Sequence, residues 1–395
     1  MTKFSKVHNL DDLRERARRY LPKPLFDFID GGAEDEVAMR HNRAAFERIR
    51  FKPRTLVDVR QRSLAVELLG APAAAPIAVA PMGSLSAFAP SAELALARAC
   101  EAAGIPCGVS TVTATSIEDL RAAAPKARLW FQLYVFNDEK LNARLVERAA
   151  AAGCDVLMVT TDTHMAPKRE RDRRNGFSLS LKKTPMNVAR VLARPRWVWD
   201  ILLRQGLPRM EMLAGEVPQV RDNISSTLHF TSQRRYSFDV ADLRTLRRQW
   251  KGKLLVKGVL RPDEAAAALE AGADGIVMSN HGGRNLESAA APLEMLPEVL
   301  DAVGKRMAIL VDSGFRRGTD VCKALALGAD GVLFGRPAAF AVAAGGDAGV
   351  GHFISIIKDE IDRTLGFLGC TSPAQLSPDL LLMDRLPAGR NAPGL

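Results

Sequence analysis

The sequence has few cysteines and none of the cysteine patterns that bind a metal or haem. Its five cysteines, Cys100, Cys107, Cys154, Cys322 and Cys370, form no C-x-x-C pair and no C-x-x-C-H motif in 395 residues. This spacing argues against a structural zinc site, a redox-active pair and covalently attached haem. We therefore expect no metal site and a chain that works in a reducing compartment.

Long apolar runs are also missing. No stretch of about 18 uninterrupted apolar residues is available to span a membrane. The polar start, MTKFSKVHNLDDLRERARRY, lacks the apolar centre of a signal peptide. With 47% hydrophobic and 25% charged residues, the composition is that of an ordinary globular protein. These features predict a cytoplasmic protein.

An early G-x-G-x-x-G turn is absent as well, which disfavours an open doubly wound nucleotide-binding sheet. Instead, short apolar runs alternate with alanine-rich segments that suit helices. The eight runs cover 76–83, 105–111, 129–134, 156–162, 253–259, 275–280, 308–314 and 331–336. Continuously apolar strands are typical of a parallel sheet buried on both faces. Eight such units predict an α/β fold, a (β/α)₈ TIM barrel.

The remaining segments suggest one domain, 1–395, built around that barrel at 76–370. Residues 1–70 are expected to form an N-terminal helical extension with a small hairpin-like region, FKPRTLVDV (51–59) and SLAVELLG (63–70), that closes the bottom of the barrel. The connection after the fourth strand is far longer than one helix requires. We therefore expect a long insertion at 175–235, and a C-terminal tail at 371–395.

Polar residues end most of the apolar runs, where the active-site rim of such a barrel lies. Helix capping explains serine, threonine and aspartate at these positions. It does not explain the lysine, glutamine, tyrosine and histidine. The residues concerned are Ser110, Gln132, Tyr134, Thr160, Asp162, Lys257, Ser279, His281 and Asp312.

Two consecutive glycine-containing loops, DSGFRRG (312–318) and FGRPAAF (334–340), follow the last two strands. Phosphate groups commonly bind there in this architecture, because glycine amides and a helix start approach the anion closely. Arg316 and Arg336 can add bidentate contacts. The loops predict a phosphorylated ligand.

Taken together, the motifs resemble those of the FMN-dependent 2-hydroxy-acid oxidising family, which includes glycolate oxidase, L-lactate dehydrogenase and (S)-mandelate dehydrogenase. The resemblance covers nearly the whole chain, and the sequences of the motifs are most similar to those of the mandelate dehydrogenase branch. It rests on LPKPLFDFIDGGAEDE, FQLYV, TTDT, RERDRRNGF, LLVKGV, SNHGGRNL, DSGFRRGTDV, KALALGADGV and FGRP, in this order. It implies oxidation of an (S)-2-hydroxy acid to the 2-oxo acid.

The resemblance also implies FMN as the cofactor. Lys257 would face the ring edge where the reduced flavin accumulates negative charge, so that a fixed ammonium favours reduction. The phosphate would be held by Gly314, Arg316, Gly335 and Arg336, with Asp312 and Ser313 beside the ribityl chain. Ring or ribityl atoms would be contacted by Ser110, Gln132, Thr160 and Ser279. The backbone along the ring would be that of Pro81, Met82 and Gly83.

For the substrate, the resemblance makes His281 the group that accepts a proton, since imidazole is suited to proton transfer near neutral pH. Asp162 would orient and stabilise the resulting imidazolium. Arg169 and Arg284 would bind the carboxylate, which a guanidinium fork fits. Tyr134 would hydrogen-bond the substrate hydroxyl.

Four positions depart from the family pattern, and one of them is Met82, where the family commonly has threonine beside the flavin. Phe28 stands where a tyrosine usually helps to hold the carboxylate, and Val112 stands where glycolate oxidase often has tryptophan. Both changes favour a bulkier apolar group on C2, so Phe28 is expected to line the substrate site. Gly83, where oxidases of the family tend to have alanine, favours a dehydrogenase.

A quinone is the expected electron acceptor, because the chain has no haem motif. The stretch 190–210 interleaves arginines with Trp197, Trp199, Ile201, Leu202 and Leu203. It fits two interpretations that are compatible, a peripheral contact with the inner face of the cell membrane and a lid over the active site. The resemblance further implies a homo-oligomer, commonly a tetramer.

Three alternatives remain from the sequence: an oxygen-using oxidase, a different FMN-binding or phosphate-binding barrel enzyme such as an isomerase, and a nucleic-acid-binding protein. The net charge of +10 suggests the last. The sequence holds no recognisable DNA- or RNA-binding module, so we expect no nucleic-acid partner.

Overall fold

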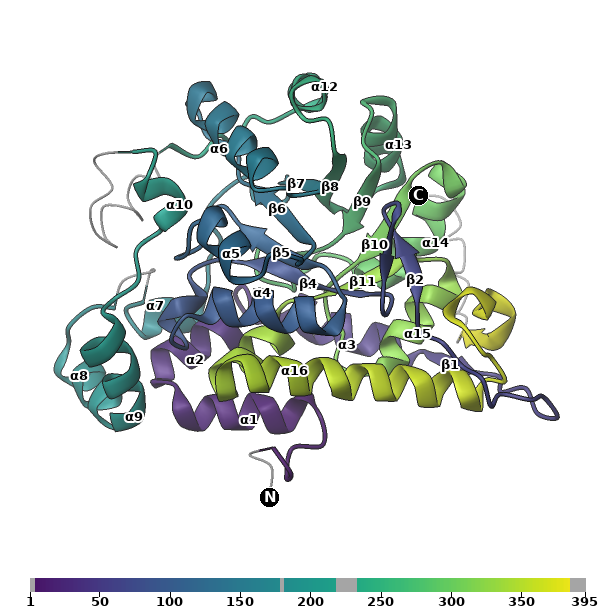
Figure 1. The fold of residues 1–395 in the computed structure, drawn as a ribbon, viewed down its shortest axis with the longest axis horizontal. Helices are drawn as coiled ribbons and strands as arrows, with labels where there is room; N and C mark the ends of the chain where they lie inside the picture. The colour runs from purple at the N-terminus through teal and green to yellow at the C-terminus, as the bar shows by residue number, and fades with distance from the viewer. Residues whose placement is uncertain (1–3, 178–180, 218–232, 384–395) are drawn as a thin grey trace, which may run out of the picture.

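The structure is a computed structural model that describes residues 4–177, 181–217 and 233–383. Eight parallel strands form a closed barrel in the order β10-β11-β4-β5-β6-β7-β8-β9 (Figure 1). They are β4 (Ile77–Met82), β5 (Cys107–Ser110), β6 (Leu129–Leu133), β7 (Val156–Thr160), β8 (Lys253–Val259), β9 (Gly275–Met278), β10 (Ala308–Val311) and β11 (Gly331–Phe334). Each lies within one of the eight predicted runs, and the predicted TIM barrel is confirmed.

The strands read as continuous apolar runs because both of their faces are buried. Trp130, Met158 and Leu255 point into the barrel and pack in its interior. Their neighbours Phe131 and Leu157 point outward into the layer between strands and helices. Successive strand residues alternate between these two cores, so polar residues find room only where the strands end.

Helices surround the barrel, and local signals set their ends. Ser116 and Asp138 cap the starts of α5 and α6 by accepting backbone hydrogen bonds. Gly104, at φ 68°, ends α4 in the left-handed conformation that glycine adopts readily. The helices are α4 (Ala92–Ala103), α5 (Ile117–Ala123), α6 (Glu139–Ala151), α12 (Val240–Gln249), α13 (Pro262–Glu270), α14 (Pro292–Val303), α15 (Gly318–Leu327) and α16 (Arg336–Phe367).

The longest helix, α16, is long and apolar enough to cross a bilayer by length and composition alone. More than half of its most apolar window is buried in the protein, and it packs against α1 (Leu10–Tyr20) and α4. The helix is interrupted at Gly345 and Gly346, whose backbone is not helical. It is therefore a core helix of this fold.

The N-terminal segment contributes α1 (Leu10–Tyr20), α2 (Lys23–Asp30) and α3 (Val37–Glu47). Strands β2 (Val66–Leu68) and β3 (Ala71–Ala73) form a hairpin. Leu68 and Ala73 of this hairpin join the interior core of the barrel. The hairpin therefore closes the bottom of the barrel, as predicted.

One part of that prediction is wrong. Phe51 belongs to β1 (Ile49–Phe51), which does not enter the hairpin but pairs antiparallel with β12 (Leu381–Met383) from the tail. The residues after β1 run as an exposed loop, in which Leu56 is fully accessible. An edge strand needs a partner for its backbone groups, and here the tail supplies it.

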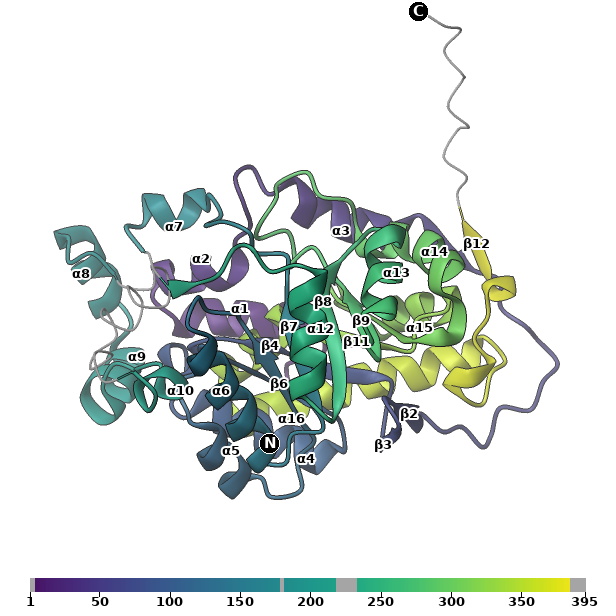
Figure 2. The ribbon, with the colours of Figure 1, turned by 90° about the horizontal axis from the view of Figure 1, so that it is seen from above.

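Between β7 and β8 the chain forms several short helices instead of one. They are α7 (Glu170–Arg174), α8 (Pro185–Leu192), α9 (Pro195–Trp197), the π-helix η2 (Val198–Gln205) and α10 (Glu211–Ala214). In Figures 1 and 2, α8 and α9 lie beside α1 and α2, at the end of the molecule away from β1. Parts of the predicted insertion (178–180 and 218–232) and tail (384–395) lie outside the described residues.

Four short 3₁₀ turns complete the described elements. Their bounds are η1 (Leu85–Ala87), η3 (Gly304–Arg306), η4 (Pro373–Gln375) and η5 (Pro378–Leu380). Of these, η1 matters for function, because it directly follows β4 at the carboxyl-terminal rim.

Candidate active site

A cavity of about 250 Å³ lies at the carboxyl-terminal ends of the barrel strands. Nearly all residues predicted for the site line it: Phe28, Pro81, Met82, Gly83, Ser110, Gln132, Tyr134, Thr160, Arg169, Lys257, His281, Arg284, Asp312, Ser313, Gly314, Arg316, Gly335 and Arg336. Asp162 and Ser279 do not line the cavity and lie behind His281 and Lys257. Residues from the ends of all eight strands, from α2 and from the connection between β7 and β8 thus meet in one space.

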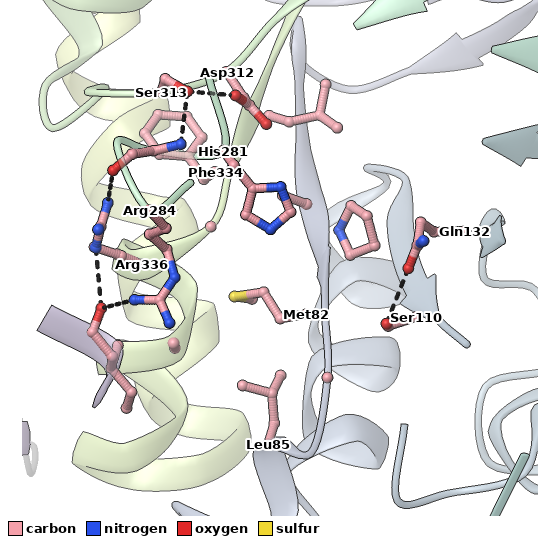
Figure 3. A pocket seen from close by; sticks show the side chains of 18 of the residues that line it. Met82, Leu85, Ser110, Gln132, His281, Arg284, Asp312, Ser313, Phe334 and Arg336 are labelled. Carbon is pink, nitrogen blue, oxygen red and sulfur yellow. Dashed lines mark hydrogen bonds between the residues drawn. The ribbon is translucent and has the colours of Figure 1, made fainter. Parts of the chain in front are cut away.

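His281 projects into this cavity from the loop after β9 (Figure 3). Its Nδ1 lies 3.1 Å from both carboxylate oxygens of Asp162. Because an ionised carboxylate only accepts hydrogen bonds, Nδ1 carries the hydrogen and Nε2 is left as a proton acceptor. Gly258 makes this pair possible, since a Cβ there would overlap the Asp162 side chain.

The backbone of this loop is unusual. His281, Gly282 and Gly283 all have positive φ, at 55°, 67° and 70°. A histidine rarely adopts this conformation. Ser313, itself at φ 73°, holds the loop by accepting hydrogen bonds from the backbone N–H groups of Asn280 and Gly282. Strain of this kind persists only where the surroundings over-determine it, which is common at active sites.

The protonation states of this pair suit proton transfer. Burial lowers the pKa of His281 below its usual value, and Asp162 offsets part of that shift. Burial opposes ionisation of Asp162, but His281 and Lys257 hold the pKa of its carboxyl below its usual range. At neutral pH the site therefore holds a neutral imidazole next to a carboxylate, the arrangement of a general base with its orienting group.

Lys257 lies at the end of β8, buried, and does not extend to the surface. Its Nζ forms an ion pair with Asp312 at 2.9 Å and donates to the hydroxyl of Ser279 at 2.8 Å. Burial favours the neutral amine, yet Asp312 and Asp162 raise the pKa of Lys257 above its usual value. The lysine is therefore a fixed ammonium in the cavity wall.

Four arginines line the same cavity, and none of them has a described carboxylate within ion-pair distance: Arg169, Arg284, Arg316 and Arg336. Burial lowers the pKa of Arg316 to about 10 and that of Arg336 to about 9. Burial and the neighbouring guanidinium of Arg169 lower the pKa of Arg284 well below its usual range. Buried charges of one sign are costly unless paired, so the cavity is built for anionic ligands.

The carbonyls at the end of α2 hold two of these arginines in place. Nη1 of Arg284 donates to the carbonyls of Phe28 and Gly31, at 2.7 and 2.9 Å. Arg336 donates to the carbonyls of Ile29 and Gly31, at 3.0 and 2.7 Å. The last carbonyls of a helix have no partner within it and carry partial negative charge. The N-terminal motif LPKPLFDFIDGGAEDE (21–36), which contains α2, thus orients the guanidinium groups of Arg284 and Arg336.

The opposite wall of the cavity presents an unsatisfied donor. Oε1 of Gln132 accepts a hydrogen bond from the Ser110 hydroxyl at 3.0 Å (Figure 3). Nε2 of Gln132 is buried and has no hydrogen-bond partner among the described residues. A buried amide without a partner is rare and costly, so this donor indicates a ligand with an acceptor at that position.

Tyr134 lines the same cavity as His281 and Arg169. Burial raises the pKa of its phenol, which therefore stays protonated and available as a donor. The guanidinium of Arg234 lies over the tyrosine ring, with its Cζ 4.6 Å from the ring centre. Arg234 comes from the end of the insertion and does not line the cavity itself, and its contact with Tyr134 was not predicted.

The rest of the cavity is apolar. The Phe28 ring lies beneath the guanidinium of Arg284, with the Arg284 Cζ 5.0 Å from the ring centre, and stacks near Phe88. Leu85, Phe88 and Met210 also line the cavity and were missed from the sequence. The first two follow β4 closely, which is a usable signal. Met210 lies in the insertion, 48 residues beyond Asp162 along the chain, and no local pattern points to it.

Side-chain packing also explains why residue 83 is a glycine. A Cβ at this position would overlap the side chain of Val112. The glycine is therefore required by its neighbour in this structure, and it does not by itself identify the electron acceptor.

The stretch 190–210 divides into a buried and an exposed half. Trp197 and Ile201 are 4% and 0% exposed, and Nε1 of Trp197 donates to the Ala87 carbonyl. Trp199 and Leu203 are 58% and 68% exposed. Of the two interpretations of this stretch, membrane contact therefore does not hold for Trp197 and Ile201, because these two side chains are buried against the protein.

Comparisons with known proteins agree with this geometry. The family model described as FMN-dependent dehydrogenase matches residues 17–383. The chain is 42% identical to (S)-mandelate dehydrogenase of Pseudomonas putida, covering 95% of this chain and 94% of the relative. It is 38% identical to L-lactate dehydrogenase of Caulobacter vibrioides, covering 96% and 99%. A crystal structure of a monotopic membrane protein, (S)-mandelate dehydrogenase, superposes with a TM-score of 0.93 at 40% identity over 96% of this chain and 100% of that one.

Proposed function

The chain belongs to the FMN-dependent dehydrogenase family, and from this premise we propose that it oxidises an (S)-2-hydroxy acid with an apolar C2 substituent to the 2-oxo acid. The observation that carries the proposal is the cavity at the rim, which combines a neutral histidine with four arginines that have no described carboxylate partner. Two of the arginines, Arg316 and Arg336, suit a phosphate group, and the other two, Arg169 and Arg284, suit a carboxylate.

The cavity fits FMN. Gly314, Arg316, Gly335 and Arg336 line one end of it, and α16 begins at Arg336. A helix start with glycine amides and two guanidinium groups would hold the phosphate. On the opposite wall, the unpartnered Nε2 of Gln132 would donate to the ring system. When bound, FMN supplies the two-electron acceptor.

The substrate would lie between His281 and the two remaining arginines. Arg169 and Arg284 would bind its carboxylate and so fix C2 next to the imidazole. Tyr134 would hydrogen-bond the hydroxyl oxygen. Nε2 of His281 would accept one proton during oxidation, and Asp162 would stabilise the imidazolium that forms. The Lys257 ammonium would place positive charge beside the edge of the flavin ring, where the reduced flavin would accumulate negative charge.

The apolar wall supports a bulky substituent on C2. Phe28, Leu85, Phe88, Val112 and Met210 line the cavity beside the carboxylate-binding arginines. Phe28 offers a ring face where a tyrosine would offer a hydroxyl. This wall favours a mandelate-like acid over L-lactate, and L-lactate over glycolate.

The electron acceptor is proposed to be a quinone reached at a membrane. The exposed Trp199, Leu202 and Leu203 of η2 form an apolar face near basic residues, which is typical of peripheral membrane contact. One similar protein of known structure, an (S)-mandelate dehydrogenase, is described as a monotopic membrane protein. We therefore include attachment to the inner face of the cell membrane in the proposal.

Anaerobic reduction of the yellow holoenzyme tests the substrate class. The flavin absorbance should bleach fastest with (S)-mandelate, more slowly with L-lactate and least with glycolate. A protein that none of these acids, nor any long-chain 2-hydroxy acid, can bleach would contradict the proposal. Reoxidation of the reduced enzyme by a quinone analogue, compared with air, then separates a dehydrogenase from an oxidase.

A further inference from the structure

A second cavity, of about 470 Å³, lies away from the active site between α1, the start of η2 and the break in α16. Its polar lining consists of Arg16, Arg19, Tyr20, Arg194, Arg196 and Asp200. Val342, Gly345 and Gly346 form the wall contributed by α16. The proposed reaction uses none of these residues.

The lining is basic, because four guanidinium groups accompany one carboxylate. One of the four, Arg19, pairs with Glu15 outside the lining at 2.8 Å, so the positive charge that faces the cavity comes mainly from the other arginines. Asp200 neutralises them poorly, since its carboxylate is 3.7 Å from Nε of Arg196 and also accepts a hydrogen bond from Tyr20. Arg194 donates only to the carbonyls of Leu21 and Ala193 in the described contacts. A concave surface with this excess of positive charge attracts anions.

The residues on either side of this basic lining are apolar and exposed. Trp199 is adjacent to Asp200 in sequence, and Leu203 follows one turn later. Leu192 precedes Arg194 and is 64% exposed. Apolar side chains beside a basic cavity match the layering of a membrane surface, where phosphates lie above the acyl chains.

From this juxtaposition we infer that the cavity is a binding site for the phosphate of an anionic phospholipid headgroup. Arg194 and Arg196 donate to the phosphate oxygens, in the bidentate geometry that guanidinium favours. Trp199 and Leu203 lie in the acyl region beside it. We favour a lipid over a soluble phosphate ester because cavity residues such as Asp200 are neighbours in the chain of the exposed apolar residues Trp199 and Leu203. The inference rests on the proposed membrane contact.

Vesicle binding by the full-length holoenzyme tests the site. Phosphatidylcholine vesicles are compared with vesicles that also contain phosphatidylglycerol, for the wild type, the double variant R194Q/R196Q and the charge-matched control R204Q/R209Q. Arg204 and Arg209 are exposed residues of the same insertion that do not line the cavity. We expect R194Q/R196Q to lose phosphatidylglycerol-dependent affinity on the order of tenfold or more, as for lost hydrogen bonds to a charged group, and the control to lose clearly less.

Asp200→Asn provides the converse test. It removes the one carboxylate of the lining, while an amide oxygen can still accept from Tyr20. Affinity for phosphatidylglycerol vesicles should therefore rise. An unfolded or loosened segment would not produce a gain, so this variant separates the site from a purely structural role.

Three results would overturn the inference. Equal losses in both double variants would mean that only overall charge matters. Saturable, R194-dependent binding of inorganic phosphate without any preference for anionic vesicles would assign the cavity to a soluble ligand. Failure to bind any vesicle, with flavin still reduced by (S)-mandelate, would remove the membrane contact and this site while leaving the proposed reaction intact.

Discussion

The two ends of the barrel are built on opposite principles. At the bottom, Leu68 and Ala73 of the β2-β3 hairpin pack into an apolar interior with Trp130 and Met158. At the rim, buried arginines have no carboxylate partner in the described part of the chain, and His281 has a strained backbone. Apolar burial stabilises the fold, whereas buried uncompensated charge and strain destabilise it.

Stability and function therefore depend mainly on residues at opposite ends of the same strands. The rim tolerates unfavourable features because the bottom and the outer helix layer supply the stability. It follows that substitutions at the two ends should separate activity from stability, and that some rim substitutions should even stabilise the protein.

The largest effect is expected at His281. His281→Gln removes the proton acceptor, and kcat for (S)-mandelate should fall by roughly 10²- to 10⁴-fold, the usual contribution of a general base. The temperature of unfolding should not fall. Stopped-flow flavin reduction and thermal unfolding measure the two quantities. His41→Gln is the control, since His41 pairs with Glu294 outside the cavity, and a comparable loss of kcat there would contradict the assignment.

Leu68→Ala should show the reverse behaviour. Truncating a buried leucine at the bottom should cost about 2 to 5 kcal/mol of stability, while kcat per folded molecule stays unchanged. Leu56→Ala is the matched control, because Leu56 is fully exposed. Denaturant unfolding and the rate of flavin reduction distinguish the outcomes. A loss of kcat in L68A at a temperature where it is fully folded would break the separation of the two ends.

Arg284→Met tests whether an arginine without a carboxylate partner serves the ligand. A lost hydrogen bond between charged groups is worth about 1.5 to 3 kcal/mol, so kcat/KM should fall roughly 10- to 150-fold. The free energy of unfolding should change little, since the removal of a buried charge is opposed by the loss of the hydrogen bonds to the carbonyls of Phe28 and Gly31. Arg62→Met is the control, because Arg62 pairs with Asp362 away from the cavity. If R284M lowered stability and left KM unchanged, the arginine would be structural.

The sequence predicted the rim better than the walls around it. Residues at strand ends follow from strand register, so His281 and Lys257 could be placed from the ends of two apolar runs. The pairing of β1 with β12 and the position of Met210 depend on contacts between residues far apart in the chain, and no local pattern encodes them. The buried half of 190–210 was mispredicted for the same reason, since Trp197 is buried by a contact with Ala87.

The pH dependence should report the pair of His281 and Asp162. Because burial lowers the pKa of His281 below its usual 6.5, the imidazole stays neutral on moderate acidification. kcat/KM should therefore hold its plateau to below pH 6.5 and fall as the imidazole becomes protonated. Asp162→Asn removes a group that raises this pKa, so the acid limb should move to still lower pH while kcat falls. An acid limb that moves upward in D162N would contradict the pairing.

The smallest expected effect concerns Phe28, where the apolar wall and the charged rim meet. Its ring lies under Arg284 and edge-on to Phe177, with ring centres 5.0 Å apart in the second pair. Phe28→Tyr would add a donor next to the carboxylate and change the apolar surface little. A neutral donor contributes about 1 kcal/mol, so kcat/KM for L-lactate and glycolate should rise by up to roughly fivefold. The value for (S)-mandelate should change less, because its ring already contacts the wall, and an equal change for all three acids would mean that Phe28 does not set the preference for large substituents.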